Sequence, residues 1–298
     1  MIVCDVSVII PAYNAQLTID RALKSVVDQT ILPREVIVVD DGSTDETYRA
    51  AQGWLDRMHG INLVVLRQKN SGPGAARNHG ISIATSDFIA FLDSDDEWLS
   101  EKLDRSLKQM DKSGACLVSH NGWICVDDQK YYLNISSRYE RAVANNFIHG
   151  LYRRGFISTS SVIARKEVIT NLGGFDETLM TGQDFDLWLR IANIPGESIL
   201  VFDDPLTNYH IYDDSITRNT GRRLDDTMEI ARRHIPLLGR SLLKALPTIW
   251  FRIIALNMEA LTAYSASGSY HNCLLIAGKL PVDLFRFTCF AVFQRCGS

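Results

Sequence analysis

The sequence predicts an α/β protein in which helices flank a mixed sheet, with a helical appendage at the C-terminal end. Three observations favour this class. Apolar runs rich in β-branched residues alternate with amphipathic stretches three times within the first hundred residues. Acidic side chains follow several of these runs, and helical apolar stretches mixed with basic residues fill the last quarter of the chain. With 298 residues, the chain is long enough to bury one large domain and an appendage.

The first strand is predicted at residues 6–10, where a continuous apolar run ends at Pro11, a residue that breaks a strand ladder and opens a loop. Further strands are expected at 35–39, 63–66 and 88–92. Parallel strands of this kind place their carboxyl ends at one edge of a sheet, where ligands of open α/β folds bind.

Helices are expected between these strands. Apolar positions from residue 19 to residue 27 fall on one helical stripe. A capping box at 43–46 predicts the start of a second helix, with Tyr48, Ala51, Leu55 and Met58 on its buried side.

Three carboxylates follow the strand at 88–92. Asp93, Asp95 and Asp96 repel one another unless a cation is present, and Asp93 and Asp95 are separated only by the small Ser94. Such a pair is placed to hold a hard divalent ion, which completes its shell with water and ligand phosphates. The alternative is a solvated acidic turn that caps a helix beginning near Ser100.

Two further segments point to the same edge of the sheet. Asp40 and Asp41 end the second strand, although Asp40 is also explained as part of a helix cap. The segment 70–78 resembles a dinucleotide fingerprint only superficially, because its third glycine is absent. It offers small residues at a helix N-terminus and the guanidinium of Arg77, which suit a phosphate, unless Arg77 is simply solvated.

Four motifs in order resemble those of the family-two glycosyltransferases, over about residues 5–220. These are inverting enzymes of the Rossmann-like GT-A fold that use nucleotide-activated sugars. The motifs stand at 6–14, 36–45, 72–78 and 91–96.

The resemblance implies a site for a nucleotide-diphosphate sugar, most simply a UDP-sugar. It assigns the divalent cation, Mn²⁺ or Mg²⁺, to Asp95 and the ribose or sugar to Asp93. It assigns the nucleotide base to Asp40. The implied donor-binding residues are Pro11, Tyr13, Asp40, Arg77, Asp93, Ser94 and Asp95.

The second half is predicted as the acceptor side, with strands at 115–119, 123–126 and 131–133. A short strand and a short helix should then end at Gly173 and Gly174. The following segment, 182–190, is predicted to begin a helix.

By the resemblance, Asp184 in the first turn of that helix is the catalytic base that takes a proton from the attacking hydroxyl. The alternative for Asp184 is a simple N-cap. Asp186 and Arg190, at i and i+4, are expected to form a surface ion pair. Weaker site residues on the acceptor side are Gln183, Trp188 and His210, although Trp188 is also expected to pack inward with Leu187 and Ile191.

The sequence departs from the family pattern at these positions. Gln183 stands where glutamate is usual, and it brings no charge to the acceptor. In the segment 209–217, His210 replaces an arginine and Tyr212 a histidine. His210 is therefore also explained as a partly exposed loop histidine.

The predicted division is a GT-A domain at 1–220, with a nucleotide-sugar half to about 115 and an acceptor half at 116–220, and a basic amphipathic helical region at 221–298. After residue 230, eight lysines and arginines stand against two acidic residues, a charge of +6 that leaves −10 for the first 230 residues. These helices are expected either to pack internally or to lie on anionic lipid.

Six cysteines without disulfide or metal spacing indicate reduced thiols, and the N-terminal apolar run is too short for a secretion signal. The expected location is cytoplasmic, either free or peripheral on the inner face of the membrane.

The function that these patterns favour is metal-dependent inverting transfer of a sugar to a hydroxyl of a glycan or lipid-linked glycan, in cell-surface polysaccharide synthesis. Two alternatives remain, a nucleotidyltransferase and a non-catalytic nucleotide-sugar-binding subunit of a polysaccharide assembly. No nucleic-acid partner is expected.

Overall fold

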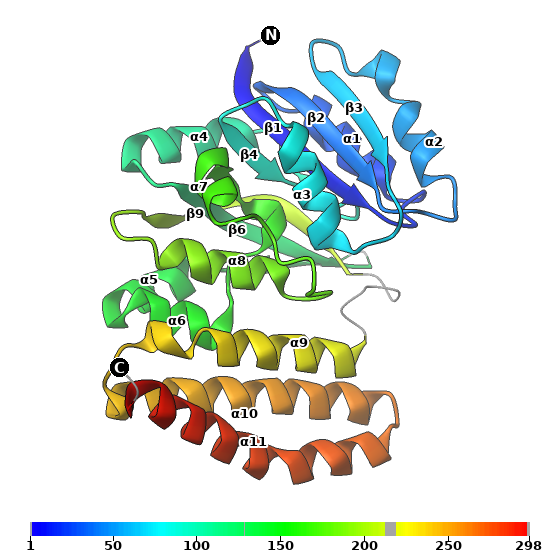
Figure 1. Cartoon of the computed structure of the whole chain (residues 1–298). Coiled ribbons are helices and arrows are strands. Elements are labelled where there is room, and N and C mark those ends of the chain that lie inside the picture. Colours follow the sequence, from blue (N-terminus) through cyan, green and yellow to red (C-terminus); the bar gives the residue numbers. More distant parts are fainter. Residues whose placement is uncertain (1, 128, 212–218, 297–298) are drawn as a thin grey trace.

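The computed structural model describes residues 2–127, 129–211 and 219–296. Within these residues nine strands form one mixed sheet, in the order β3-β2-β1-β4-β8-β6-β9-β5, with β7 paired to β6 (Figure 1). The strands are β1 (Val3–Ala12), β2 (Leu32–Asp40), β3 (Asn62–Arg67), β4 (Phe88–Phe91), β5 (Glu97–Trp98), β6 (Leu117–Val126), β7 (Gln129–Leu133), β8 (Ile163–Arg165) and β9 (Ile199–His210).

The first four strands form the parallel part of the sheet. β2 and β4 flank β1, and β3 lies outside β2, all in parallel register. From β8 onward the sheet becomes mixed, because β8 runs antiparallel to both β4 and β6 while β9 runs parallel to β6. The predicted mixed α/β sheet is therefore confirmed.

The first strand continues past Pro11, contrary to the prediction. Pro11 pairs with Val39 and Ala12 with Asp40 of β2. The missing N–H costs nothing here because the opposite neighbour, β4, ends at Phe91, which pairs with Ile9. The strand end thereby moves two residues toward the loops that carry the site.

The predicted helix from the capping box to Met58 is wrong. Helix α2 (Thr47–Gln52) is short, and a separate 3₁₀ turn follows at Leu55–Arg57. The Ser43 hydroxyl accepts a hydrogen bond from the Asn14 N–H at 2.9 Å instead of capping the helix. Gly53, which follows the helix directly, favours an early stop.

The strands expected at 115–119 and 123–126 are one continuous strand, β6. β9 pairs with it from Leu117 to Cys125 and so supports the middle of the strand. Gly122 stands there because a Cβ would lie 2.6 Å from Cε2 of Tyr209.

Helices cover both faces of the sheet and build two hydrophobic cores. One core packs α1, α2 and α4 against one face, and the other packs α3 and α5 to α8 against the opposite face. The helices are α1 (Ile19–Val27), α3 (Pro73–Ile83), α4 (Lys102–Ser113), α5 (Ser136–Asn145), α6 (Phe147–Arg154), α7 (Lys166–Asn171) and α8 (Gln183–Ala192).

The last three helices stack in layers at the end of the molecule farthest from the N-terminus (Figure 1). They are α9 (Thr220–Arg233), α10 (Leu242–Ala266) and α11 (Tyr270–Cys296). Buried side chains of α9 and α10, such as Ile230 and Ile249, belong to the same core as Trp188 of α8. One face of the helical region thus packs internally. No helix in the described part of the chain is long and apolar enough to span a bilayer.

Candidate active site

Three parallel strands deliver their carboxyl ends to one edge of the sheet. β1 ends at Ala12, β2 at Asp40 and β4 at Phe91, and the loops that carry the predicted donor residues leave from these points. This is the edge at which open α/β sheets bind ligands.

The loop after β1 is tied to the loop after β2. Ser43 accepts a hydrogen bond from the Asn14 N–H at 2.9 Å, and the Asn14 side-chain oxygen accepts one from the Thr44 N–H at 2.9 Å. Pro11 is buried at the base of this pair, whereas Tyr13 is 43% exposed. The ring of Tyr13 therefore stands on a fixed loop, and its contact with a nucleotide stays a prediction.

Asp40 is completely buried at the end of β2. Its Oδ1 accepts a hydrogen bond from the Ser43 N–H at 3.0 Å, and Arg67 Nε lies 3.1 Å from its Oδ2. It does not cap α2, whose N-cap is Glu46. A contact between Asp40 and a base requires the covering residues to move, so this assignment also stays a prediction.

Asp41 holds the loop that precedes α3. Its Oδ1 accepts hydrogen bonds from Gln68 Nε2 and the Ser71 N–H, both at 2.9 Å, and its Oδ2 accepts one from the Gly72 N–H at 2.8 Å. Because three donors occupy this carboxylate, Asp41 supports the site rather than facing a ligand.

Arg77 is buried, so the alternative of a solvated arginine is wrong. Its Nη2 lies 2.5 Å from Oδ1 of Asp93, and its guanidinium stacks over the Phe175 ring at 5.4 Å. The buried Nε and Nη1 have no hydrogen-bond partner among the described residues. Two donors of Arg77 are thus held in place beside the acidic cluster, where an anionic ligand would satisfy them.

The acidic residues after β4 form a turn that is anchored to the 3₁₀ turn η2 (Thr159–Ser161). The Ser160 hydroxyl accepts a hydrogen bond from the Asp93 N–H at 3.0 Å and donates one to Asp96 Oδ2 at 2.6 Å. None of these carboxylates caps α4, whose N-cap is Glu101 without a side-chain bond. The alternative of a helix-capping acidic turn is therefore wrong.

The electrostatics of this turn favour a bound cation. Burial, and then the negative charge of Asp93, raise the pKa of Asp95 to about 6. Burial, and then its two acidic neighbours, raise the pKa of Asp96 well above its ordinary value. Ser94 lies between the carboxylates and is half-buried, and Arg21 of α1 donates to the Asp95 carbonyl.

Oxygen donors of this kind suit Mg²⁺ or Mn²⁺. Among the described residues no group of three or more His, Cys, Asp or Glu side chains is arranged to hold a metal. Asp93 and Asp95 therefore fit an ion that takes the rest of its shell from water and ligand phosphates, and do not form a complete protein cage.

Asp184 lies in the first turn of α8 and faces the same 3₁₀ turn. The Thr159 hydroxyl donates to its Oδ2 at 2.7 Å, and the Phe185 N–H donates to its Oδ1 at 2.8 Å. The N-cap of α8 is Gly182, so the N-cap alternative for Asp184 is wrong. Adjacent residues of η2 thus hold Asp184 on one side and the turn of Asp93 on the other.

The acceptor-side residues fall in different environments. Trp188 is fully buried, with its ring 6.2 Å from Phe91 and 6.1 Å from Phe175. It belongs to the core, so its predicted place on the acceptor side is wrong. Gln183 is buried next to Asp184, and its Oε1 has no hydrogen-bond partner within the described part of the chain.

His210 is the last residue of β9 and not a loop residue. Its N–H lies 3.3 Å from Asp96 Oδ1, and its Nε2 lies 3.6 Å from Glu97. Burial, and then the nearby Arg21, lower its pKa. His210 therefore borders the acidic turn. The second departure, at Tyr212, lies outside the described residues.

The expected ion pair of Asp186 and Arg190 is confirmed, but its predicted place on the surface is wrong, because Asp186 is completely buried. Its Oδ2 accepts from Arg190 Nε at 2.8 Å, while its Oδ1 lies 2.8 Å from His234 Nε2 and 3.2 Å from Arg233 Nη1. This network fastens α8 to the end of α9.

Sequence reasoning missed three supporting residues: Arg21, Thr159 and Ser160. The run of hydroxyl residues at 158–161 was the only signal for two of them. Their partners lie 25 to 74 positions away, so no local pattern reveals the contacts.

With acidic side chains at the carboxyl edge of a parallel sheet, the fold and this site are typical of α/β enzymes that bind their ligands at this edge. The family model described as "Glycosyl transferase family 2" matches residues 7–169, more than half of the chain, and the chain belongs to this family. It is a glycosyltransferase of the GT-A fold.

Individual relatives agree with this result. The chain is 33% identical over 213 residues to "Amylovoran biosynthesis glycosyltransferase AmsB" of Erwinia amylovora, covering 69% of each chain. It is 31% identical over 239 residues to "Putative teichuronic acid biosynthesis glycosyltransferase TuaG" of Bacillus subtilis, covering 77% of this chain and 89% of TuaG. It spans only 30% of an uncharacterized glycosyltransferase of Rickettsia felis, to which it is 34% identical.

Solved structures share the fold. S. aureus TarS 1–349 superposes with a TM-score of 0.64 at 19% identity, covering 98% of this chain and 92% of TarS 1–349. The mannosyltransferase PcManGT from Pyrobaculum calidifontis, solved in complex with GDP-Man and Mn²⁺, superposes with a TM-score of 0.62 at 19% identity, covering 98% and 87%.

Proposed function

We propose that this chain is an inverting glycosyltransferase that moves a sugar from a nucleotide-diphosphate sugar to a hydroxyl of a glycan or lipid-linked glycan in cell-surface polysaccharide synthesis. The names of the relatives AmsB and TuaG support the polysaccharide context. The observation that carries the proposal is the η2 junction, where Thr159 holds Asp184 and Ser160 holds the turn of Asp93.

On the donor side, the loops after β1, β2 and β4 bind the nucleotide, most simply a UDP-sugar, and Asp93 and Ser94 contact the ribose or sugar. Asp95 holds Mn²⁺ or Mg²⁺, which when bound neutralises charge on the diphosphate. The buried Nε and Nη1 of Arg77 donate to the same leaving group.

On the acceptor side, Asp184 accepts the proton from the attacking hydroxyl. The acceptor oxygen then forms a bond to the anomeric carbon as the bond to the diphosphate breaks, and the electron pair leaves with the nucleoside diphosphate. The Thr159 hydroxyl and the Phe185 N–H orient the carboxylate for this transfer. Residues 1–115 thus serve the donor and 116–220 the acceptor.

We also propose that the outer face of α10 and α11 rests on an anionic lipid surface. Leu243 is 87% exposed, Leu274 75% and Phe285 69%, and α11 also exposes the basic Lys279 and Arg286. Helices that expose both apolar and basic side chains match the acyl boundary and the headgroups of such a surface.

The experiment for the transferase is a screen of nucleotide sugars against the purified full chain. With Mn²⁺ present, one donor should raise the melting temperature and release nucleoside diphosphate slowly, and a chelator should abolish both effects. A ligand present at about 100 times its dissociation constant raises the free energy of unfolding by about 2.7 kcal/mol.

Two outcomes contradict the proposal. Release of pyrophosphate from a nucleoside triphosphate and a sugar phosphate indicates a nucleotidyltransferase. Donor binding without turnover, with or without acceptor, indicates a non-catalytic binding subunit.

A further inference from the structure

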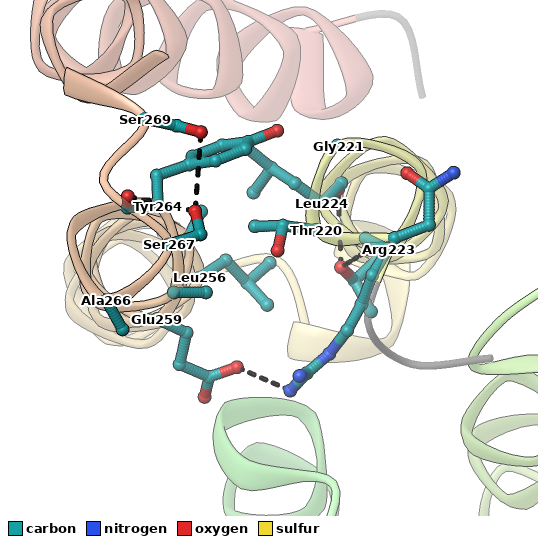
Figure 2. A pocket seen from close by; sticks show the side chains of 14 residues that line it. Thr220, Gly221, Arg223, Leu224, Leu256, Glu259, Tyr264, Ala266, Ser267 and Ser269 are labelled. Atoms are coloured by element: carbon teal, nitrogen blue, oxygen red, sulfur yellow. Dashed lines mark hydrogen bonds and ion pairs between the residues drawn. The ribbon is translucent and has the colours of Figure 1, made fainter. Parts of the chain in front are cut away.

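A cavity of about 710 Å³ lies between the start of α9, the second half of α10 and the turn to α11 (Figure 2). Its volume falls in the range, roughly 300–1,000 Å³, of pockets that hold small organic ligands. Its lining residues fall between 219 and 269, so it is separate from the donor site described above.

The walls of the cavity combine hydroxyl groups with one aromatic ring. Thr220, Ser267 and Ser269 supply hydroxyls. Tyr264 points from α10 toward α9, and a Cβ at Gly221 would lie 3.1 Å from its hydroxyl oxygen. A small number of polar groups that converge around an aromatic ring is typical of a pocket that orients its ligand by hydrogen bonds.

The charge of the lining decides which ligand class fits. Arg223 of α9 and Glu259 of α10 are ion-paired at 2.9 Å across the cavity (Figure 2). Among the described lining residues they are the charged ones, so the pocket is neutral. A charged ligand would have to compete with this ion pair for either side chain, whereas a neutral polyhydroxylated ligand finds both donors and acceptors here.

The cavity adjoins the segment that carries the proposed base. Thr227 lines the cavity, and its Cγ2 would lie 3.5 Å from a Cβ at Gly182. The next residue toward the start of α9, Asp226, accepts hydrogen bonds from the Thr181 N–H at 2.9 Å and the Thr181 hydroxyl at 3.0 Å. Helix α9 therefore contacts the residues just before Asp184 and also forms a wall of the cavity.

We propose that this cavity is a glycan subsite, which binds sugars of the acceptor away from the hydroxyl that reacts at Asp184. The inference rests on the proposed transferase function and adds where the acceptor chain is held. It explains why the pocket is neutral and rich in hydroxyls, and why it shares α9 with the segment before the base. It also predicts that the enzyme prefers acceptors of several sugars over a single sugar.

The test fills the cavity without touching the donor site. Ala263 lines the cavity and is exposed, so Ala263→Phe inserts a ring into it while the fold is kept. Thr262, its exposed neighbour on α10, lies outside the lining, and Thr262→Phe is the matched control. The probes are oligosaccharides of increasing length, released by mild acid from the surface polysaccharide of cells that carry the gene, with the donor found in the screen above.

In the unaltered chain, the KM should fall about tenfold from the shortest to the longest oligosaccharide, since binding energy gained far from the reacting atoms lowers KM. Ala263→Phe should remove this length dependence and leave kcat and the KM for the donor unchanged, whereas Thr262→Phe should preserve it.

A length dependence that survives Ala263→Phe, or that Thr262→Phe removes equally, overturns the subsite. Transfer that shows no length dependence in the unaltered chain also overturns it, although the proposed function then stands. No transfer to any oligosaccharide overturns the proposed function and the subsite with it, so the two failures are told apart.

Discussion

The sheet edge and the C-terminal helical layer differ in how strongly contacts hold their side chains in place. At the sheet edge, polar groups are buried and paired, as for Asp41 with its three donors and Arg77 against Asp93. In the helical layer, α10 and α11 leave large apolar side chains such as Leu274 and Phe285 in solvent. Buried polar contacts of the first kind fix geometry, whereas exposed apolar surface of the second kind usually marks a place for a partner.

The C-terminal helical layer is nevertheless joined to α8 and the segment before it by two sets of contacts. Asp186 of α8 contacts Arg233 and His234 at the end of α9, and Asp226 of α9 holds the segment before Asp184. The helical layer is therefore held against the acceptor side by direct side-chain contacts. The contrast predicts that changes at the buried contacts alter chemistry or stability strongly, while changes on the outer helical face alter neither.

The largest expected effect is at the proposed base. Asp184→Asn keeps the shape of the side chain and one of its two acceptor oxygens but removes the group that takes the proton. We expect kcat to fall about 10³-fold, within the range of general-base contributions. Release of nucleoside diphosphate in the presence of acceptor measures the rate, and calorimetry should show an unchanged affinity for the nucleotide.

The control is Asp28→Asn, which changes an exposed carboxylate at the end of α1. Full transfer activity in the Asp184→Asn variant rejects the base assignment.

The second effect concerns the buried network. Asp186→Asn leaves Arg190 and Arg233 without their buried counter-charge, and we expect a loss of about 3 kcal/mol in the free energy of unfolding. The matched control is Asp204→Asn, since Asp204 pairs with Arg105 at 2.8 Å at a site where Arg105 is 44% exposed. That change should cost about 1 kcal/mol or less. If urea denaturation shows that both variants lose the same free energy of unfolding, the expected difference between buried and exposed ion pairs is contradicted.

Much of the sheet edge could be predicted, because it depends on local patterns. Continuous apolar runs placed β1, β2 and β4, and the positions after them carried Asp40 and Asp93. The start of α8 was predicted equally well, with Asp184 in its first turn. These features follow from residue order alone, since parallel strands share one edge.

The errors arose where contacts join distant segments. Asp186 looked like a surface residue because its i+4 partner Arg190 suggested an exposed pair, but Arg233 and His234 cover it from 47 and 48 positions away. Trp188 was predicted to pack inward and was also named on the acceptor side; the Phe91 and Phe175 rings enclose it, so only the inward packing is confirmed. Helical periodicity identifies an inward face but does not say which residues of it meet the site.

The third prediction concerns how the stability contributed by the buried Asp186 changes with pH. Burial alone would raise the pKa of Asp186, but the hydrogen bond from His234 and the charge of Arg190 outweigh it and lower the pKa. A lowered pKa gives stability that is present above the ordinary value near 4 and is lost as the pH falls through the folded-state value. The stability gap between the unaltered chain and Asp186→Asn should therefore narrow as the pH falls below about 4. A gap that widens below pH 4 in urea denaturation contradicts this account.

The fourth prediction addresses the cation. Asp95→Asn removes a charge from the turn where neighbouring carboxylates raise one another's pKa. We expect nucleotide affinity in Mn²⁺ to weaken about tenfold, roughly 1.4 kcal/mol, with no change in the presence of a chelator. Calorimetric titration with the nucleoside diphosphate measures both values. An unaltered affinity in Mn²⁺, or equal weakening with and without the metal, argues against a metal ligand at this position.

The smallest expected effect on stability is on the outer helical face. Leu274→Ser combined with Phe285→Ser changes side chains that are 75% and 69% exposed, so the free energy of unfolding should move by about 0.5 kcal/mol or less. Sedimentation with phosphatidylcholine vesicles that contain about one third phosphatidylglycerol should show binding by the unaltered chain and little by the double variant. Leu55→Ser, at an exposed apolar residue that is 54% accessible near α2, is the control and should bind as before. If the double variant binds the vesicles fully, or if neutral vesicles bind the unaltered chain equally well, the exposed face of α10 and α11 does not serve an anionic lipid surface.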